Sequence, residues 1–173
     1  MRYADLISND VTAGPGFTVT LFVQGCPHMC SGCFNPETWD FNGGKEVPAD
    51  FPEIILEKIN ANGLKRRFCV MGGEPLCKEN AFLTHMILNY IKEKSPETEL
   101  AVWTGYTWEE LSSLGGNPHI KEILSLIDFM VDGRFQLEKK DLSLKLRGSS
   151  NQRIIDVKET LKQNQIVLKE EYY

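Results

Sequence analysis

Residues 17–35 read FTVTLFVQGCPHMCSGCFN, which joins a strand-like segment directly to a group of three cysteines. The segment 17–24 is rich in β-branched and aromatic side chains and is predicted to form a β-strand. Cys26, Cys30 and Cys33 follow it at a spacing typical of metal and iron–sulfur sites. Three thiolates are one too few to close a tetrahedral zinc site or a four-iron cluster. Either a fourth ligand comes from elsewhere in the chain, or one coordination position is left open.

Beyond this stretch, short apolar runs alternate with segments of helical spacing. The predicted helices span 52–59, 80–92 and 118–126, with a further one starting at the capping box 107–110, and the predicted strands span 68–71, 99–104, 127–131 and 153–157. Such alternation favours a single α/β domain over residues 1–173, with a mostly parallel sheet and crossover helices.

Ligands of such sheets bind at the carboxyl ends of the strands. Cys26, Gly72, Gly105 and Asp132 each come at or just after the end of a predicted strand. We therefore expect four separate loops to converge on one edge of the sheet, with the cysteines at that edge.

Composition excludes several classes of protein. The 173 residues are 42% hydrophobic and 25% charged, as in an ordinary globular domain, and the net charge is −5. No basic block predicts a nucleic-acid partner, and no apolar run is long enough to cross a membrane. The first residues lack the pattern of a secretory signal, so a cytoplasmic location is expected. Five cysteines, an odd number, favour metal binding over a disulfide framework.

A second motif, MGGEP at 71–75, follows the predicted strand 68–71. Its two glycines would let the backbone approach a ligand closely. The carboxylate of Glu74 could accept hydrogen bonds from an ammonium group. The motif is a weak signal by itself, but it comes one βα unit after the cysteine loop.

C-x3-C-x2-C followed by G-G-E-P resembles the radical S-adenosylmethionine (SAM) superfamily. Further stretches are similar to the activating enzymes of anaerobic ribonucleoside-triphosphate reductase: GPG at 14–16, LFVQGC at 21–26, GCFNPETW at 32–39, WTGYTWEEL at 103–111, VDGRF at 131–135 and RGSSNQR at 147–153. The likeness runs in order from about residue 10 to about residue 155. TGYTWEEL and RGSSNQR are the parts specific to this family.

The resemblance implies an open, abbreviated partial (β/α) barrel and a glycyl-radical-enzyme activase. Cys26, Cys30 and Cys33 would ligate a [4Fe–4S] cluster whose open iron binds the methionine end of SAM. The amino group of SAM would be bound at the motif made of Gly72, Gly73 and Glu74, and the nucleoside would lie along Gly32, Cys33 and Phe34. Asp132 stands near the place of an Asp-x-Lys pattern in related activases and is a further candidate for cofactor binding.

The resemblance also implies partners. The radical would be passed to a glycine of the large subunit of anaerobic ribonucleotide reductase, and a flavodoxin or ferredoxin would supply the electron. A homodimer is a further assembly left open.

Other classes remain as alternatives. A Cys3His zinc-binding structural module would use the same cysteines with a histidine. A ferredoxin-like electron carrier would need a fourth cysteine, which is not in place. A radical SAM enzyme acting on a small molecule would need a pocket of its own. An activase of another glycyl radical enzyme, such as pyruvate formate-lyase, would keep the chemistry and change the partner.

Residues around the motifs have simpler interpretations. Cys69 and Cys77 are expected to be inert buried thiols. We interpret His28 as a loop residue and Trp103 as a packing residue. The segment 147–153 is expected to offer hydrogen-bond donors to SAM or to the partner.

Overall fold

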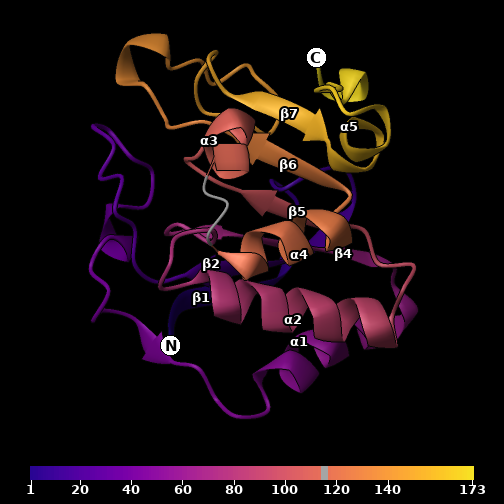
Figure 1. Cartoon of the computed structure of the whole chain (residues 1–173). Helices are drawn as coiled ribbons and strands as arrows, with labels where there is room; N and C mark the ends of the chain where they lie inside the picture. The colour runs from indigo at the N-terminus through magenta and orange to yellow at the C-terminus, as the bar shows by residue number, and fades with distance from the viewer. Residues whose placement is uncertain (114–116) are drawn as a thin grey trace.

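The computed structural model describes residues 1–113 and 117–173 and shows a mixed α/β fold around one seven-stranded sheet (Figure 1). The strand order is β3-β1-β2-β4-β5-β6-β7. The strands are β1 (Arg2–Asp10), β2 (Phe17–Val23), β3 (Lys45–Glu46), β4 (Arg66–Gly72), β5 (Leu100–Trp103), β6 (Phe129–Asp132) and β7 (Arg153–Asp156).

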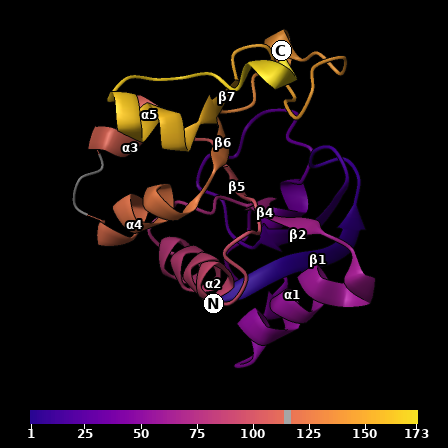
Figure 2. The ribbon, with the colours of Figure 1, turned by 90° about the vertical axis from the view of Figure 1, so that its right-hand side faces the viewer.

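The described residues also form five α-helices and four short 3-10 helices. The α-helices are α1 (Phe51–Asn60), α2 (Ala81–Lys94), α3 (Trp108–Ser113), α4 (Pro118–Leu126) and α5 (Val157–Gln163), and the 3-10 helices are Pro36–Thr38, Ala61–Gly63, Leu137–Lys139 and Glu170–Tyr172. Figures 1 and 2 show α1, α2 and α4 along one face of the sheet.

The central strands are buried on both faces. Alternate side chains point to opposite sides of a strand, so β4, β5 and β6 each contribute to two hydrophobic clusters. In β4, Phe68 and Val70 pack into the large core beneath the helices, whereas Cys69 packs on the other face. That second face is covered by Tyr172 near the C-terminus and by Ala13 after β1. The loops described below lie at the carboxyl ends of these strands.

The sheet is parallel in its middle and antiparallel at its edges. Pairs β2–β4, β4–β5 and β5–β6 are parallel, whereas β1 pairs antiparallel with β2 and β3, and β7 pairs antiparallel with β6. The prediction of a mostly parallel sheet is therefore correct for the centre and wrong for the edges. Sequence analysis did not identify β1, because Asp, Ser and Asn residues such as those of β1 are depleted in strands.

Predicted helix boundaries agree with the structure to within a few residues. At the start of α3, the amide of Thr107 donates to Glu110 (2.8 Å) and the amide of Glu110 donates to the Thr107 hydroxyl (3.2 Å), which confirms the capping box. α4 begins with Pro118 behind the cap residue Asn117. Among the described residues, no helix is both long enough and apolar enough to span a membrane.

Candidate functional site

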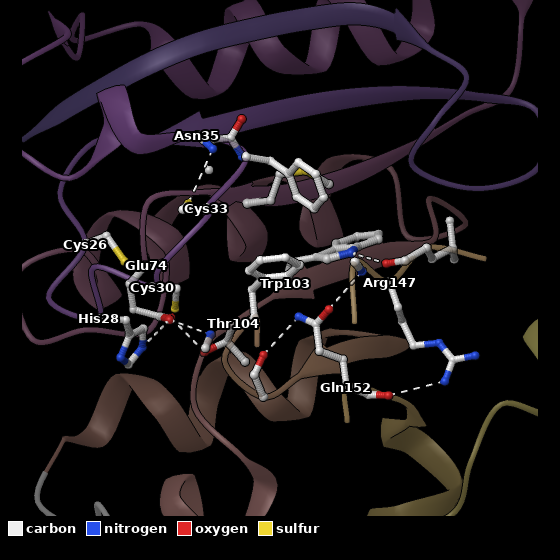
Figure 3. Close-up of a pocket in the computed structure, with 18 of the residues that line it drawn as sticks. Cys26, His28, Cys30, Cys33, Asn35, Glu74, Trp103, Thr104, Arg147 and Gln152 are labelled. Carbon is white, nitrogen blue, oxygen red and sulfur yellow. Dashed lines mark hydrogen bonds and ion pairs between the residues drawn. The ribbon is translucent and has the colours of Figure 1, made fainter. Parts of the chain in front are cut away.

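A pocket of about 450 Å³ lies at the carboxyl ends of the central strands (Figure 3). The segments that follow β2, β4, β5 and β6 all line it, so the predicted convergence of four loops is confirmed. Of the predicted site residues, the pocket is lined by Cys26, Cys30, Cys33, Phe34, Gly72, Gly73 and Glu74. Gly32 and Asp132 are not among its lining residues.

The cysteine loop is held by backbone and amide hydrogen bonds. The amide of Cys26 donates to the carbonyl of Trp39 (3.2 Å), and the amide of Cys33 donates to the carbonyl of Cys30 (3.1 Å). Gln24 donates through Nε2 to the carbonyl of Asp40 (2.7 Å), which closes the base of the loop. The amide of Asn35 also points at the sulfur of Cys33 (3.4 Å). These bonds fix the backbone of all three cysteines before any ligand binds.

Three cysteines could take part in a zinc site or in an iron–sulfur cluster. Zinc–sulfur bonds of about 2.3 Å would bring all sulfurs on one zinc ion within about 4.6 Å of one another. In the described part of the chain, the single group of three such residues with all ligand atoms within 4.8 Å is His85, His119 and Glu122, and it contains no cysteine. The three cysteines therefore do not form a group of this compact kind in the described residues. In a four-iron cluster each thiolate would bind a different iron, so the three sulfurs would not have to meet at one ion.

Burial and neighbouring charges affect the protonation of two of the cysteine thiols. Burial raises the pKa of the Cys26 thiol, and the Glu74 carboxylate raises it further. Burial likewise raises the pKa of Cys30, with an added contribution from Cys33. Without a positive partner these thiols stay protonated, and iron would supply the charge that stabilises them as thiolates.

Glu74 is the central polar group of the pocket wall, with 1% of the residue exposed. Its Oε1 accepts from the amide of Leu76 (2.9 Å) and the hydroxyl of Thr104 (2.7 Å). Its Oε2 accepts from the amide of Gly105 (2.7 Å) and lies 2.8 Å from Nε2 of His28 (Figure 3). The carboxylate thus joins the ends of β4 and β5 to the cysteine loop, and these four donors use its main acceptor positions.

His28 belongs to this network, so its interpretation as a mere loop residue is wrong. Its side chain is 6% exposed, and its ring meets Tyr106 edge-on at 4.6 Å between centroids. A Cβ atom at Gly105 would lie 2.3 Å from the imidazole, so a glycine is required where the histidine packs. No local sequence signal marks this contact, because His28 and Glu74 lie 46 positions apart.

Asn80, at the start of α2, is a second residue that sequence analysis missed. Its buried amide nitrogen lies 3.0–3.1 Å from the carbonyl oxygens of Gln24, Gly25 and Glu74. Asn80 therefore links the start of the cysteine loop to the MGGEP turn through hydrogen bonds. No local pattern distinguishes this asparagine from an ordinary helix start.

The glycines of MGGEP are required for packing against the neighbouring chain. A Cβ atom at Gly72, whose φ is +96°, would lie 2.8 Å from the backbone of Phe22. A Cβ atom at Gly73 would lie 2.4 Å from the carbonyl oxygen of Gly25. The turn can therefore lie against β2 and the cysteine loop only because both positions are glycine.

Phe34 and the segment 147–153 form the opposite wall of the pocket. Phe34 packs against Phe135 at 5.1 Å between ring centroids. The side chain of Gln152 accepts from the amide of Gly148 (2.9 Å) and donates to the carbonyl of Gly133 (3.0 Å). The segment is thus folded into the pocket wall by its own hydrogen bonds.

Trp103 also lines the pocket, which goes beyond the packing role expected for it. Its indole nitrogen donates to the carbonyl of Leu146 (2.9 Å), next to Arg147 (Figure 3). The Nε atom of Arg147 is buried and has no hydrogen-bond partner among the described residues. The guanidinium donates through Nη1 to the carbonyl of Gln152 (3.3 Å) and lies 4.1 Å from the ring centroid of Tyr173. Arg147 therefore brings a positive charge to this wall of the pocket.

Asp132 lies behind the pocket. Its carboxylate, also 1% exposed, accepts from Nε of Arg153 (3.0 Å) and from the amide of Trp108 (2.8 Å). A direct role in cofactor binding stays a prediction for this residue. Its observed contacts tie β6 to β7 and to the start of α3.

Cys69 and Cys77 are buried as expected, and neither lines the pocket. Burial raises the pKa of each thiol to about 12. Cys69 lies 3.3 Å from the hydroxyl of Thr20. Both are protonated packing residues at neutral pH.

Comparisons with known proteins agree with the geometry of the cysteine site. A family model described as a 4Fe-4S single cluster domain matches residues 12–155. The chain is 37% identical over 153 residues to the anaerobic ribonucleoside-triphosphate reductase-activating protein of Escherichia coli strain K12, covering 88% of this chain and 96% of the relative. Relatives with the same name are 36% identical in Pasteurella multocida (88% and 95% covered) and 32% identical in Enterobacteria phage T4 (89% and 93% covered). The chain therefore belongs to the family of anaerobic ribonucleoside-triphosphate reductase-activating proteins.

Proposed function

We propose that the chain is a single-domain radical SAM activase that cleaves S-adenosylmethionine and generates the glycyl radical of anaerobic ribonucleotide reductase. The observation that supports this most is the pocket itself. Three thiols and the Gly-Gly-Glu turn, which follow the neighbouring strands β2 and β4, line one cavity of about 450 Å³. That volume lies in the range of small-molecule sites, and the thiols leave one cluster iron without a protein ligand.

Each part of the pocket has a proposed role. Cys26, Cys30 and Cys33 hold a [4Fe–4S] cluster. When bound, the reduced cluster supplies one electron that breaks the C5′–S bond of SAM and gives methionine and a 5′-deoxyadenosyl radical. The chain itself holds the two reactants together and limits their contact with water.

The amino group of SAM is proposed to bind at the Gly72-Gly73-Glu74 turn. Because Glu74 already accepts from four donors, we assign the direct contact to the main-chain carbonyl oxygens of the two glycines. The buried negative charge of Glu74 then attracts the ammonium group from behind them. The nucleoside is proposed to lie along Gly32, Cys33 and Phe34, and Gly32 allows the backbone turn just before Cys33 at φ +74°.

The pocket is open on the side of Phe34 and Leu142, which are 54% and 74% exposed although they line it. Such an opening suits a protein substrate whose loop must reach the bound SAM. We propose that the sheet is an abbreviated, open form of the radical SAM partial barrel, and that the glycine-bearing loop of the reductase large subunit enters here. A flavodoxin or ferredoxin is the proposed electron donor.

The first test is SAM cleavage. The protein is reconstituted with iron and sulfide without oxygen, reduced with dithionite and supplied with SAM, and methionine and 5′-deoxyadenosine are measured. Both products are expected from the wild type and neither from Cys30→Ala. A Cys69→Ala variant is the matched control, because it removes a thiol outside the pocket and should keep the activity.

Partner identity needs a second measurement. The activated protein is mixed with the large subunit of anaerobic ribonucleotide reductase, and an organic radical signal is sought by electron paramagnetic resonance. Transfer to pyruvate formate-lyase in its place would assign the other activase class. A colourless protein that retains one zinc per chain after reconstitution would contradict the enzyme proposal altogether.

A further inference from the structure

A cluster of potential metal ligands lies outside the pocket, between α2 and α4. It consists of His85 from the first half of α2, His119 from the first turn of α4, and Glu122 one turn further along α4. None of the three lines the pocket. Figures 1 and 2 both show α4 lying along α2 on the helix-covered face of the sheet. The two helices therefore present these side chains to one another.

The distances within the cluster match those between two ligands of one metal ion, and His119 and Glu122 are also within hydrogen-bond distance of each other. Oε2 of Glu122 lies 3.2 Å from Nδ1 of His85 and 3.3 Å from Nδ1 of His119. Hydrogen bonds between nitrogen and oxygen cluster near about 2.9 Å. With metal–ligand bonds of about 2.0–2.1 Å, two ligands of a tetrahedral ion lie about 3.3 Å apart. All three ligand atoms lie within 4.8 Å of one another, so one ion can contact them together.

Neighbouring side chains hold the two rings in place. The imidazoles of His85 and His119 stack with centroids 5.3 Å apart and an interplanar angle of 29°. Phe82 meets the His119 ring edge-on at 5.4 Å. This arrangement limits rotation of both rings, so that two Nδ1 atoms face one carboxylate oxygen. A preformed donor set reduces the ordering cost of binding an ion.

The site is accessible to an ion from solution. The side chains of His85, His119 and Glu122 are 23%, 30% and 51% exposed. Solvent can therefore reach the cluster and supply a fourth ligand to a tetrahedral ion. Imidazole nitrogen donors favour zinc and similar transition metals, whereas magnesium and calcium prefer all-oxygen sites.

We propose that His85, His119 and Glu122 bind one zinc-like divalent transition-metal ion, which clamps α4 to α2. Each imidazole gives its Nδ1 lone pair to the ion and keeps its proton on Nε2. Glu122 supplies one carboxylate oxygen and part of the neutralising charge. The site is independent of the iron–sulfur chemistry, because it shares no residue with the pocket.

Zinc binding tests the proposal. Anaerobic titration calorimetry is run with zinc ions alone on the cluster-loaded protein, whose pocket thiols are occupied, and iron content is measured before and after. One zinc ion per chain is expected in the wild type, and at least about tenfold weaker binding in His85→Gln and in His119→Gln. Glu122→Gln is the third variant, and Glu93→Gln removes a carboxylate elsewhere on α2 and should leave zinc binding unchanged.

A thermal melt gives a second readout that does not depend on the heat of binding. Zinc is expected to raise the Tm of the wild type and of Glu93→Gln, but not that of a His85→Gln/His119→Gln double variant. The absorbance of the iron–sulfur cluster checks that each variant is folded. Zinc affinity unchanged in the double variant, or binding weaker than about 1 mM in the wild type, would overturn the proposal.

Discussion

Glu74 and Asp132 are two carboxylates in equivalent places of the fold with different surroundings. Each lies at the carboxyl end of a parallel strand, β4 or β6, and each is 1% exposed. Glu74 is in the pocket wall and accepts from two amides, a hydroxyl and His28. Asp132 lies behind the pocket and forms an ion pair with Arg153. Asp132 at the end of β6 thus has a structural contact, whereas Glu74 after β4 belongs to the pocket wall. The loops that surround each carboxylate make this difference.

The difference concerns charge. The guanidinium of Arg153 is shared between Asp132 and Glu109, and these two carboxylates raise its pKa. The charge of Asp132 is therefore balanced within the protein. Among the described residues, no arginine or lysine pairs with Glu74, so we expect its charge to be available to a cationic ligand in the pocket. Four predictions test this contrast.

Replacing Glu74 should have the largest effect. In Glu74→Gln the amide NH2 must face two donors, either Leu76 and Thr104 or Gly105 and His28. We expect a loss of about 3 kcal/mol in the free energy of unfolding, because buried donors lose their acceptor. SAM cleavage should fall about 100-fold as the pocket shifts. Urea unfolding and the rate of 5′-deoxyadenosine formation measure the two effects.

Glu79→Gln is the control for that variant, because Glu79 is a nearby glutamate whose side chain is exposed. It should behave as the wild type. Full cleavage activity in Glu74→Gln would show that the pocket does not use this carboxylate.

Asp132→Asn should affect stability without affecting the pocket. The variant leaves Arg153 with Glu109 alone, and we expect a loss of about 2 kcal/mol in the free energy of unfolding. SAM cleavage measured below the unfolding temperature should stay within about threefold of the wild type, because the carboxylate does not line the pocket. A fall of more than tenfold with an intact cluster would instead assign Asp132 to cofactor binding.

His28→Ala should have a smaller effect on the pocket side. It removes one of the four donors to Glu74 and the ring that packs on Tyr106. We expect a loss of about 1 kcal/mol and faster release of iron to a chelator, because the cysteine loop is less firmly attached. His28→Gln retains a donor and should recover most of the loss. Identical iron release from all three proteins would rule out an attachment role.

The smallest effect is a pH dependence of the free energy of unfolding, which comes from Glu109, the second carboxylate paired with Arg153. The hydrogen bonds from Arg153 lower the pKa of Glu109 to about 2, against 4.5 for the free side chain. Between these values the unfolded chain binds more protons, so this pair stabilises the fold above pH 4.5 and loses its effect as pH falls towards 2. Because Glu109 is 60% exposed, the contribution should be below about 1 kcal/mol. Unfolding of the wild type and Glu109→Gln between pH 5 and about 2.5 should therefore converge at the acid end.

Much of the fold was predictable because its signals are local. The capping box at Thr107 and Glu110, the helix 118–126 and the strand before Cys26 are all set by neighbouring residues. The strand β1, which lies between β3 and β2, was not predictable in this way. Its polar residues are tolerated because β2 and β3 supply its hydrogen-bond partners, and those partners are distant in sequence.

The site divides in the same manner. Cys26, Cys30, Cys33 and the glycine turn were singled out from local motifs, and the resemblance to a known family supplied their predicted roles. The contact of His28 with Glu74 joins residues 46 positions apart, and Asn80 reaches the cysteine loop across 55 and 56 positions. No window of sequence contains such pairs, so spacing could not reveal them.

The sequence by itself therefore determined the alternation of strands and helices, the placement of cysteines after a strand, and the chemistry that three thiols allow. Tertiary structure decided which buried carboxylate faces the pocket and which is balanced by Arg153. It also brought His85 of α2 beside His119 and Glu122 of α4. The physical reason is that backbone conformation follows from near neighbours, whereas the burial, hydrogen bonding and charge of a side chain depend on segments that meet only when the chain is folded.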